Sequence, residues 1–231
     1  MSQQQPRPAM AGIRAAIIDL DGTMVHTAPD FQVAINRMRD ELGLPPLSIE
    51  TVMTFVGKGS ENLMRRVLGV DFDADGVERM FEQAMSAYQR HYLAINGDYS
   101  SVYDGVHEGL AAMKQSGLRL ACVTNKPIAF ARPLLQKTGL ATYFELVYGG
   151  DSLAKKKPDP LPMLTVCKDF ALDPSQVVAI GDSSNDAEAA RAAGCRSLTV
   201  PYGYNHGKPV QSIDSDGIVA SLHVAANLLA A

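Results

Sequence analysis

The sequence AAIIDLDGT, residues 15–23, contains the pattern that decides the fold. An apolar run of this kind is typical of a parallel strand that is covered on both faces, and the Asp-Gly pair after it is a common turn. Side chains two residues apart on an extended chain point the same way, so Asp19 and Asp21 are expected to converge where the strand ends. A hard divalent cation relieves the repulsion between two such carboxylates. The segment therefore predicts a strand that ends in an acidic site.

The composition is that of an ordinary globular protein with a sizeable core. The chain has 231 residues, of which 46% are apolar and 20% charged, and its formal net charge is −4. This length fits one core with an insertion better than two full domains. An acidic chain without a basic stripe argues against a nucleic-acid partner. An anionic substrate would therefore have to be attracted by local lysines, backbone N–H groups and a bound metal.

The start of the chain and its cysteines bear on where the protein works. Residues 1–12 are rich in Gln and Pro, which predicts a short disordered tail and neither a signal peptide nor a membrane anchor. The three cysteines have no metal-binding spacing, and Cys122 and Cys195 are predicted to be buried free thiols. An odd number without a disulfide framework favours a reducing compartment. We expect a cytoplasmic protein with no membrane partner, as a monomer or homodimer.

Beyond a first strand at 14–20, the chain divides into a helical part and an alternating part. No strand is expected between 27 and 100, where Asp30 is predicted to cap the first helix. The predicted helices of this part are 30–42, a short one from 48, 60–68 and 76–93. From 106 onward helices alternate with strands predicted at 119–123, 146–148, 177–180, 197–200 and 218–219. This alternation predicts βαβ units with right-handed crossovers.

These patterns together predict an α/β fold. Its core would be a Rossmann-like parallel sheet with helices on both faces, and a small all-helical domain would be inserted after the first strand. The predicted boundaries are a tail at 1–12, the core at 13–26 and 101–231, and the helical domain at 27–100. The inserted helices are expected to cover the strand ends from which they emerge.

Four polar clusters follow predicted strands, and open α/β sheets bind ligands beyond the carboxyl ends of their strands. The clusters are Asp19/Asp21, Thr124-Asn125-Lys126, Lys157-Pro158 and 181–186, with the sequence GDSSND. Together they supply what phosphoryl transfer requires: a nucleophile, donors for the phosphoryl oxygens, fixed positive charge and metal ligands.

Each cluster also has a purely structural interpretation. Thr124-Asn125 could cap a helix, as could Asp182 and Asn185. The run 155–157 could be a set of solvated lysines, which is the favoured interpretation for Lys155 and Lys156. Chance alone is a poor explanation for all four clusters falling on the ligand-binding edge of one sheet.

The order of these motifs resembles the haloacid dehalogenase superfamily of phosphatases. The resemblance rests on 19–23 (DLDGT), Thr124-Asn125, Lys157-Pro158 and 181–186, and it spans nearly the whole chain. It implies that the inserted helices are the small cap domain of that family. It also implies a Mg²⁺-dependent phosphatase that hydrolyses a small phosphomonoester through an aspartyl-phosphate intermediate.

The resemblance implies roles for individual residues. Asp19 would be the nucleophile, and Asp21 the general acid that protonates the leaving oxygen and then the base that activates water. Thr124 and the Asn125 backbone N–H would hold the phosphoryl oxygens, while Lys157 would offset the charge of nucleophile and phosphate.

The same resemblance implies a metal site and a turn at the substrate. Mg²⁺ would be held by the Asp19 side chain, the Asp21 backbone carbonyl and Asp182. Asp186 would orient a metal-bound water or Lys157 from behind these ligands. Gly22, in the turn after Asp21, counts among the substrate-binding residues.

Further stretches resemble the phosphoglycolate phosphatases within this superfamily. They are 27–30 (TAPD), 56–59 (VGKG), 123–127 (VTNKP), 149–151 (GGD) and 202–207 (YGYNHG). The resemblance implies a small phosphorylated acid as substrate, foremost 2-phosphoglycolate, and a place in carbohydrate metabolism.

Several residues outside the four motifs have two interpretations. Lys58, with Gly57 beside it, could bind the carboxylate of a small acid or could be a solvated lysine in a flexible loop. His26 replaces an acidic residue usual in the family, which leaves cap closure and substrate preference open, and a residue at the hinge surface is favoured. Tyr204 and His206 are interpreted as structural or surface residues rather than catalysts.

Alternatives to 2-phosphoglycolate remain. Pyrophosphate, sugar phosphates, amino-sugar phosphates and phosphonoacetaldehyde are possible substrates, the last through a Schiff base on Lys58, and a sugar-phosphate mutase is a less favoured activity. A 2-haloacid dehalogenase is disfavoured because Asp21 supplies the proton-transfer carboxylate that phosphate chemistry needs. A catalytically silent binding module is opposed by the intact acidic, Thr and Lys positions.

Overall fold

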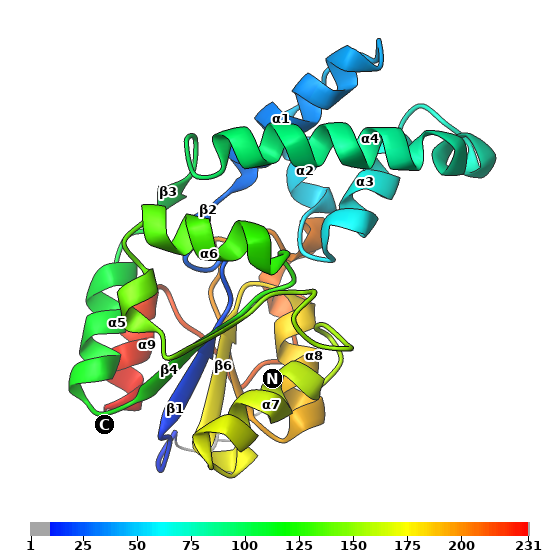
Figure 1. Ribbon diagram of the computed structural model, residues 1–231. Coiled ribbons are helices and arrows are strands. Elements are labelled where there is room, and N and C mark those ends of the chain that lie inside the picture. The colour runs from blue at the N-terminus through cyan, green and yellow to red at the C-terminus, as the bar shows by residue number, and fades with distance from the viewer. Residues whose placement is uncertain (1–9, 231) are drawn as a thin grey trace, which may run out of the picture.

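A computed structural model describes residues 10–230 and contains a six-stranded parallel sheet with helices packed around it (Figure 1). The spatial order of the strands is β5-β4-β1-β6-β7-β8. Their bounds are β1 Ala15–Ile18, β4 Arg119–Val123, β5 Leu146–Tyr148, β6 Val177–Gly181, β7 Arg196–Thr199 and β8 Gly217–Ile218. The predicted α/β class is confirmed, and each predicted strand lies within a few residues of its expected position. The predicted tail falls mostly outside the described residues.

The first strand lies at the centre of the sheet, although the rest of the sheet comes from the second half of the chain. β1 pairs with β4 on one side and with β6 on the other, and Ile18 is level with Cys122 and Ile180. All four of its residues are buried, as expected for a parallel strand that is covered on both faces. This position places the residues that follow β1 in the middle of the carboxyl edge of the sheet.

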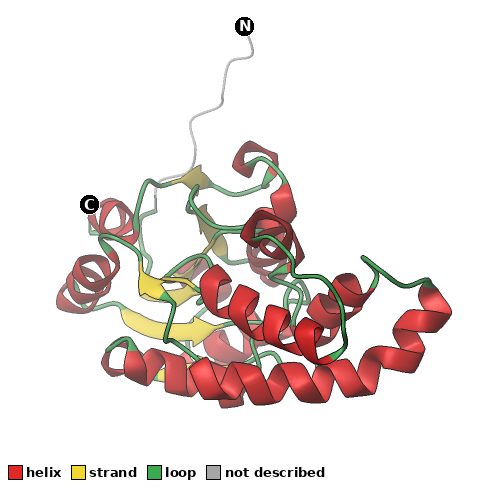
Figure 2. Ribbon diagram, turned by 90° about the horizontal axis from the view of Figure 1, so that it is seen from above, coloured by secondary structure: helices red, strands yellow, loops and turns green. Residues whose placement is uncertain are grey.

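Helices cover both faces of the sheet, and the alternation of side chains along β1 divides its contacts between them. Ala16 and Ile18 pack with helices α5, α6 and α9, whereas Ala15 and Ile17 pack with α7 and α8. The helix bounds are α5 Val106–Gln115, α6 Ile128–Lys137, α7 Leu161–Phe170, α8 Ser184–Ala193 and α9 Leu222–Leu229. Figure 2 shows from above that helices surround the strands. Short 3-10 turns lie at Ala141–Tyr143, Pro174–Gln176, Asn205–Gly207 and Val210–Ser212.

Four further helices form a block that lies over one end of the sheet (Figure 1). They are α1 Ala28–Glu41, α2 Ile49–Phe55, α3 Ser60–Leu68 and α4 Ala74–Ile95, and we call them the helical block. Their buried side chains form a hydrophobic cluster that is separate from the two clusters of the sheet and that also takes in Phe130 and Tyr204. The four predicted helices are therefore present. As a domain with the boundaries 27 and 100, this segment stays a prediction.

The two connections to the helical block run side by side as a ribbon that the sequence did not predict. β2, Val25–His26, pairs with β3, Ser101–Val102, in antiparallel fashion. Asp30 lies within the first turn of α1 instead of capping it. Its buried carboxylate accepts hydrogen bonds from the backbone of Gly97 and Tyr99 and from the Ser100 hydroxyl. Asp30 thus joins the start of the block to its end. No helix among the described residues is long and apolar enough to cross a membrane.

Candidate active site

A pocket lies at the carboxyl edge of the sheet, between the strand ends and the helical block. Asp19 follows β1, and its backbone N–H donates to the Ile180 carbonyl of the neighbouring strand. Thr124 follows β4, and its backbone N–H donates to the Tyr148 carbonyl of β5. Asp182 follows β6. Eight of the residues predicted for the site line the pocket: Asp19, Asp21, Gly57, Thr124, Asn125, Lys157, Asp182 and Asp186.

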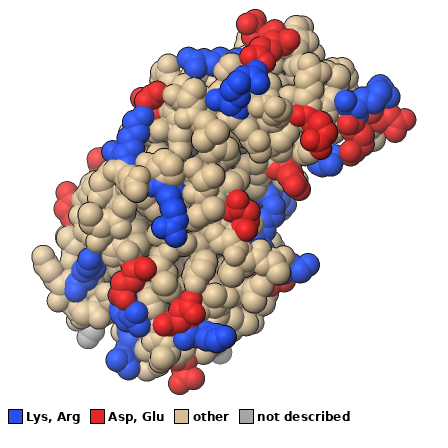
Figure 3. Space-filling model, in the orientation of Figure 1, with Lys and Arg blue, Asp and Glu red and all other residues tan. Residues whose placement is uncertain are grey.

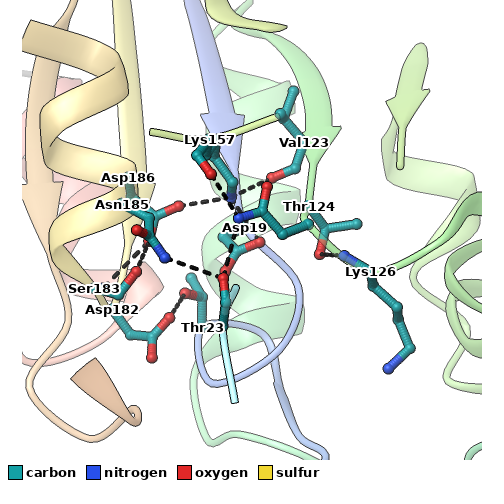
Figure 4. Close-up of polar contacts among 12 residues, drawn as sticks. Asp19, Thr23, Val123, Thr124, Lys126, Lys157, Asp182, Ser183, Asn185 and Asp186 are labelled. Atoms are coloured by element: carbon teal, nitrogen blue, oxygen red, sulfur yellow. Dashed lines mark hydrogen bonds and ion pairs between the residues drawn. The ribbon is translucent and has the colours of Figure 1, made fainter. Parts of the chain in front are cut away.

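The Lys157 ammonium occupies the centre of the charged side of the pocket (Figure 4). Its Nζ lies 2.8 Å from Asp19 Oδ1 and 2.6 Å from Asp186 Oδ1, and it donates to the Val123 carbonyl at 2.7 Å. Lys157 is only 3% exposed, so these ion pairs are little screened by water. The neighbouring Lys155 and Lys156 are exposed, in agreement with their predicted solvated state.

The loop between β6 and α8 presents two more carboxylates. Asp182 accepts hydrogen bonds from the Thr23 hydroxyl at 3.0 Å and from the Tyr204 backbone at 2.6 Å. Asp186 accepts from the hydroxyl and backbone N–H of Ser183, which precedes α8. Asp186 therefore satisfies a free N–H at the start of the helix. Asp182 and Asn185, for which capping was the alternative interpretation, do not have this role.

Three carboxylates of the pocket lie close enough to share a cation. One oxygen each from Asp19, Asp182 and Asp186 lies within 4.8 Å of the others. Burial raises the pKa of Asp19 to about 7, against the attraction of Lys157. Burial, with repulsion from Asp19 and Asp186, raises the pKa of Asp182 to about 8. Burial and mutual repulsion disfavour the ionised form of these carboxylates, and a bound divalent cation would stabilise that form. This donor set fits a divalent metal.

We call Lys157, Asp19, Asp182 and Asp186 the charged group. Thr124 and Asn125 lie beside it in the pocket and connect it to the helical block. The Thr124 hydroxyl accepts from the Lys126 backbone N–H at 3.2 Å, which leaves its hydrogen available as a donor. The Asn125 side chain donates to the Lys157 carbonyl at 2.8 Å and to the Gly57 carbonyl of the helical block at 3.0 Å. The side-chain amide of Asn125 thus joins its own motif to the Lys157-Pro158 motif and to the helical block.

Comparison with known proteins identifies the family. The sequence model of one protein family, the haloacid dehalogenase-like hydrolases, matches residues 13–194. The chain belongs to the haloacid dehalogenase-like hydrolases. The predicted resemblance is therefore confirmed, and the chain is a hydrolase.

Relatives that are similar to this chain over most of its length carry a more specific name. A phosphoglycolate phosphatase of Thiobacillus denitrificans is 50% identical over 93% of this chain and 94% of its own length. One of Nitrosospira multiformis is 48% identical over 94% of this chain and 96% of its own. A crystal structure of a predicted phosphoglycolate phosphatase from Haemophilus somnus 129PT superposes with a TM-score of 0.88 at 32% identity, covering 95% and 99% of the two chains.

Two of the predicted residues do not line the pocket of this dehalogenase-like hydrolase. The Lys58 side chain is exposed, and the loop that carries it reaches the pocket through Gly57 and Gly59 instead. Gly22 lies behind Asp182: its φ is +83°, and an added Cβ would lie 2.5 Å from Asp182 Oδ2. Gly22 therefore allows the turn to pass against a carboxylate of the charged group.

Residues that sequence reasoning did not place in the site also contribute to it. The Asn185 side chain donates to the same Gly57 carbonyl as Asn125, at 3.0 Å. The Tyr204 hydroxyl accepts from the backbone N–H of Thr27 at 2.8 Å, so Tyr204 links the Asp182 loop to the start of α1. Nothing in the local pattern distinguished Asn185 from a helix cap, and only the packing of the block reveals its partner.

His26, which replaces the usual acidic residue, is part of the ribbon that carries the helical block. Its Nδ1 lies 3.2 Å from the hydroxyls of both Tyr103 and Tyr204. It is half-buried between these rings, and burial lowers its pKa. His26 is therefore packed between two tyrosines rather than fully at the surface, and it does not line the pocket.

The face of the molecule drawn in Figure 3 carries no large patch of a single charge. On the face drawn in Figure 3, lysines and arginines are interspersed with acidic residues. With a net charge of −4, any attraction of an anion depends on the buried ammonium groups of the pocket.

Proposed function

We propose that this chain is a Mg²⁺-dependent phosphatase that hydrolyses 2-phosphoglycolate to glycolate and phosphate through an aspartyl-phosphate on Asp19. One observation carries the proposal: the buried Lys157 ammonium lies 2.8 Å from the Asp19 carboxylate, beside two further carboxylates. A carboxylate can approach a phosphate dianion only where positive charge offsets the repulsion. The names of the similar relatives support the substrate class.

In the first half of the reaction, an Asp19 oxygen attacks phosphorus and the bond from phosphorus to the leaving oxygen breaks. Asp21 donates its proton to that oxygen, so that the alcohol leaves neutral. The Thr124 hydroxyl and the Asn125 backbone N–H hold phosphoryl oxygens, and Lys157 stays paired with the nucleophile. Removal of any of these groups would slow release of phosphate from every substrate.

In the second half, Asp21 takes a proton from water, and the water oxygen attacks phosphorus. The bond from phosphorus to Asp19 breaks, which frees phosphate and restores the carboxylate. The Asp19 side chain, the Asp21 carbonyl and Asp182 would hold Mg²⁺, with Asp186 keeping Lys157 in place. When bound, the metal neutralises charge that develops on the phosphoryl oxygens.

The substrate is proposed to be small because aromatic side chains share the pocket with the charged residues and take up part of its space. Phe31 and Tyr88 come from the helical block and Phe130 from α6, and all three line the pocket. A large sugar would have to displace them. This supports 2-phosphoglycolate over sugar phosphates. The cytoplasmic location and the monomeric or homodimeric state stay predictions from the sequence.

A direct test measures phosphate release from 2-phosphoglycolate by the purified enzyme, with and without EDTA and with Mg²⁺ added back. The proposal expects turnover that EDTA abolishes and Mg²⁺ restores. Ordinary turnover in the presence of EDTA would overturn the metal requirement. A lack of turnover with 2-phosphoglycolate alongside rapid turnover of another phosphomonoester would overturn the substrate.

A further inference from the structure

A second buried ammonium, that of Lys126, lies in the same pocket and has no part in the reaction described above. Lys126 follows Thr124 and Asn125 directly, is 4% exposed and lines the pocket together with Asp19 and Asp21. In Figure 4 its side chain extends away from Lys157 and the charged group. The two ammonium groups therefore serve different parts of the pocket.

The surroundings of Lys126 come from both the core and the helical block. Its Nζ lies 3.0 Å from Asp21 Oδ1 and donates to the Tyr92 hydroxyl at 2.6 Å. It also lies 4.4 Å from the centre of the Phe31 ring and 4.6 Å from that of Tyr92. Aromatic faces stabilise a cation, but they accept no strong hydrogen bond from it. A buried charge in such a site is costly and calls for an explanation.

One of the three N–H donors of this ammonium remains available for a ligand. An ammonium has three hydrogens, and Asp21 and Tyr92 account for two of them. Within residues 10–230 no third acceptor contacts Lys126 Nζ. A buried donor without an acceptor points to an acceptor on the ligand.

The position of Lys126 tells which part of the ligand it would meet. Asp21 protonates the leaving oxygen in the proposed mechanism, so a group 3.0 Å from the Asp21 carboxylate lies on the leaving-group side. In 2-phosphoglycolate the carboxylate is attached to the carbon that bears the leaving oxygen. The carboxyl carbon is only two bonds from the leaving oxygen, so the carboxylate can reach Lys126 when that oxygen meets Asp21.

We propose that Lys126 forms a carboxylate subsite, which selects phosphate esters of small 2-hydroxy acids. The inference rests on the proposed phosphatase function. An ammonium that is already paired with Asp21 suits the single charge of a carboxylate better than the double charge of a second phosphate group. The exposed Lys58, the candidate from the sequence, lies outside the pocket, so Lys126 replaces it in this role.

The test compares 2-phosphoglycolate with 2-phosphoglycolamide, in which a neutral amide of the same shape replaces the carboxylate, using kcat/KM for phosphate release. The wild-type enzyme is expected to prefer the carboxylate by at least about thirtyfold, because the amide loses the negative charge that the buried Lys126 ammonium would meet. In Lys126→Met this preference falls to within about threefold. Lys168→Met, on the exposed surface of α7, is the matched control and keeps the wild-type ratio.

The other outcomes separate this subsite from the function on which it rests. Equal turnover of both compounds by the wild type would overturn the subsite and leave the phosphatase in place. No phosphate release from either compound would overturn the phosphatase itself. If Lys126→Met lowers both reactions equally and displaces the pH profile of both, Lys126 acts only through Asp21 and the subsite is wrong. A collapse of the ratio in Lys58→Met instead would assign the carboxylate to Lys58.

A measurement on the wild-type enzyme keeps the proposal testable should Lys126→Met fail to fold. Glycolate and glycolamide are compared as competitive inhibitors of phosphate release from 2-phosphoglycolate. The subsite predicts that glycolate inhibits at a concentration at least about tenfold lower than glycolamide does. Equal inhibition by the two compounds would overturn it.

Discussion

The two sides of the active-site pocket are built differently. On the phosphoryl side, Lys157 is surrounded by carboxylates and every group comes from the sheet core. On the leaving-group side, Lys126 meets one carboxylate from the core and two aromatic rings from the helical block. In the proposed mechanism, one side gathers charge for a reaction that all phosphate esters share, and the other would meet the part of the ester that varies.

Such a division would let a fold keep its chemistry at the strand ends while its substrate specificity changes in the helical block. Strand ends hold their side chains at fixed positions, as the backbone hydrogen bond from Asp19 to β6 illustrates. The helical block packs in a hydrophobic cluster that is distinct from the two clusters of the sheet, so its aromatic residues should be able to change with little effect on the sheet. Changes on the phosphoryl side should therefore affect all substrates alike, and changes on the other side should depend on the substrate.

The largest effect is expected from Asp19→Asn. Without a nucleophile, the rate of phosphate release should fall by on the order of 10⁴-fold or more, for 2-phosphoglycolate and for phosphate esters without a carboxylate alike. Steady-state assays with two esters measure this, and circular dichroism checks that the variant is folded. Retained turnover of either ester would remove Asp19 from the reaction.

Lys157→Met should have the next largest effect. Removal of the ammonium leaves Asp19 and Asp186 facing each other in a buried site, and the transition state loses a charge-assisted donor. We expect kcat/KM to fall by about 10²–10³-fold for both esters, with a lowered melting temperature. Lys156→Met, next to it in sequence but exposed, is the control. A loss confined to 2-phosphoglycolate would contradict the division between the two sides.

The pH dependence of stability provides a third test of the phosphoryl side. Burial raises the pKa of Asp19 and of Asp182 from the ordinary value of 3.8 to about 7 and about 8. Between pH 4 and these values the folded state therefore binds more protons than the unfolded state. Stability consequently falls as pH rises through this window, and the loss is complete above about pH 8.

The measurement is the melting temperature of the metal-free protein from pH 5 to pH 9, with and without Mg²⁺. Without metal, the contribution of these two groups lowers the melting temperature toward pH 9. Mg²⁺ should raise it more at pH 9 than at pH 5, because the metal binds the deprotonated carboxylates. An effect of Mg²⁺ that is the same at both values would show that the metal does not bind at Asp19 and Asp182.

The smallest effect is expected at the contact that holds the helical block over the pocket. Asn185→Ala removes one of the two amides that donate to the Gly57 carbonyl, while Asn125 retains the other. Loss of one hydrogen bond of about 1 kcal/mol should raise KM about fivefold and change kcat little. Asn227→Ala, exposed on α9, is the control. A large loss of kcat with unchanged KM would assign Asn185 to the chemistry instead of to closure.

Much of the core and of the phosphoryl side could be predicted because both depend on local pattern. The apolar run 15–18 predicted a strand buried on both faces, and β1 lies at the centre of the sheet. Residues that follow parallel strands meet at one edge whatever the loops do, which brings Asp19, Thr124 and Asp182 together. Small errors at the ends of elements do not disturb this convergence.

The leaving-group side could not be predicted in the same way, because it forms between segments that are distant in sequence. Lys126 meets Tyr92 across 34 positions and Asp21 across 105, and no spacing rule links them. The glycines around Lys58 indicated a close approach to a ligand, but the structure uses the Gly57 carbonyl there and leaves the Lys58 side chain exposed. The ribbon of β2 and β3 has only two residues in each strand, too few for an alternation pattern.

The central claim is that Asp19 carries the phosphoryl group, and chemical trapping tests it most directly. The enzyme is quenched in acid during turnover of 2-phosphoglycolate and reduced with borohydride, which converts an aspartyl-phosphate to homoserine, and the digested peptides are analysed by mass spectrometry. The account predicts homoserine at position 19, dependent on substrate and absent from Asp19→Asn. Rapid phosphate release with homoserine at another aspartate, or at none, would contradict it.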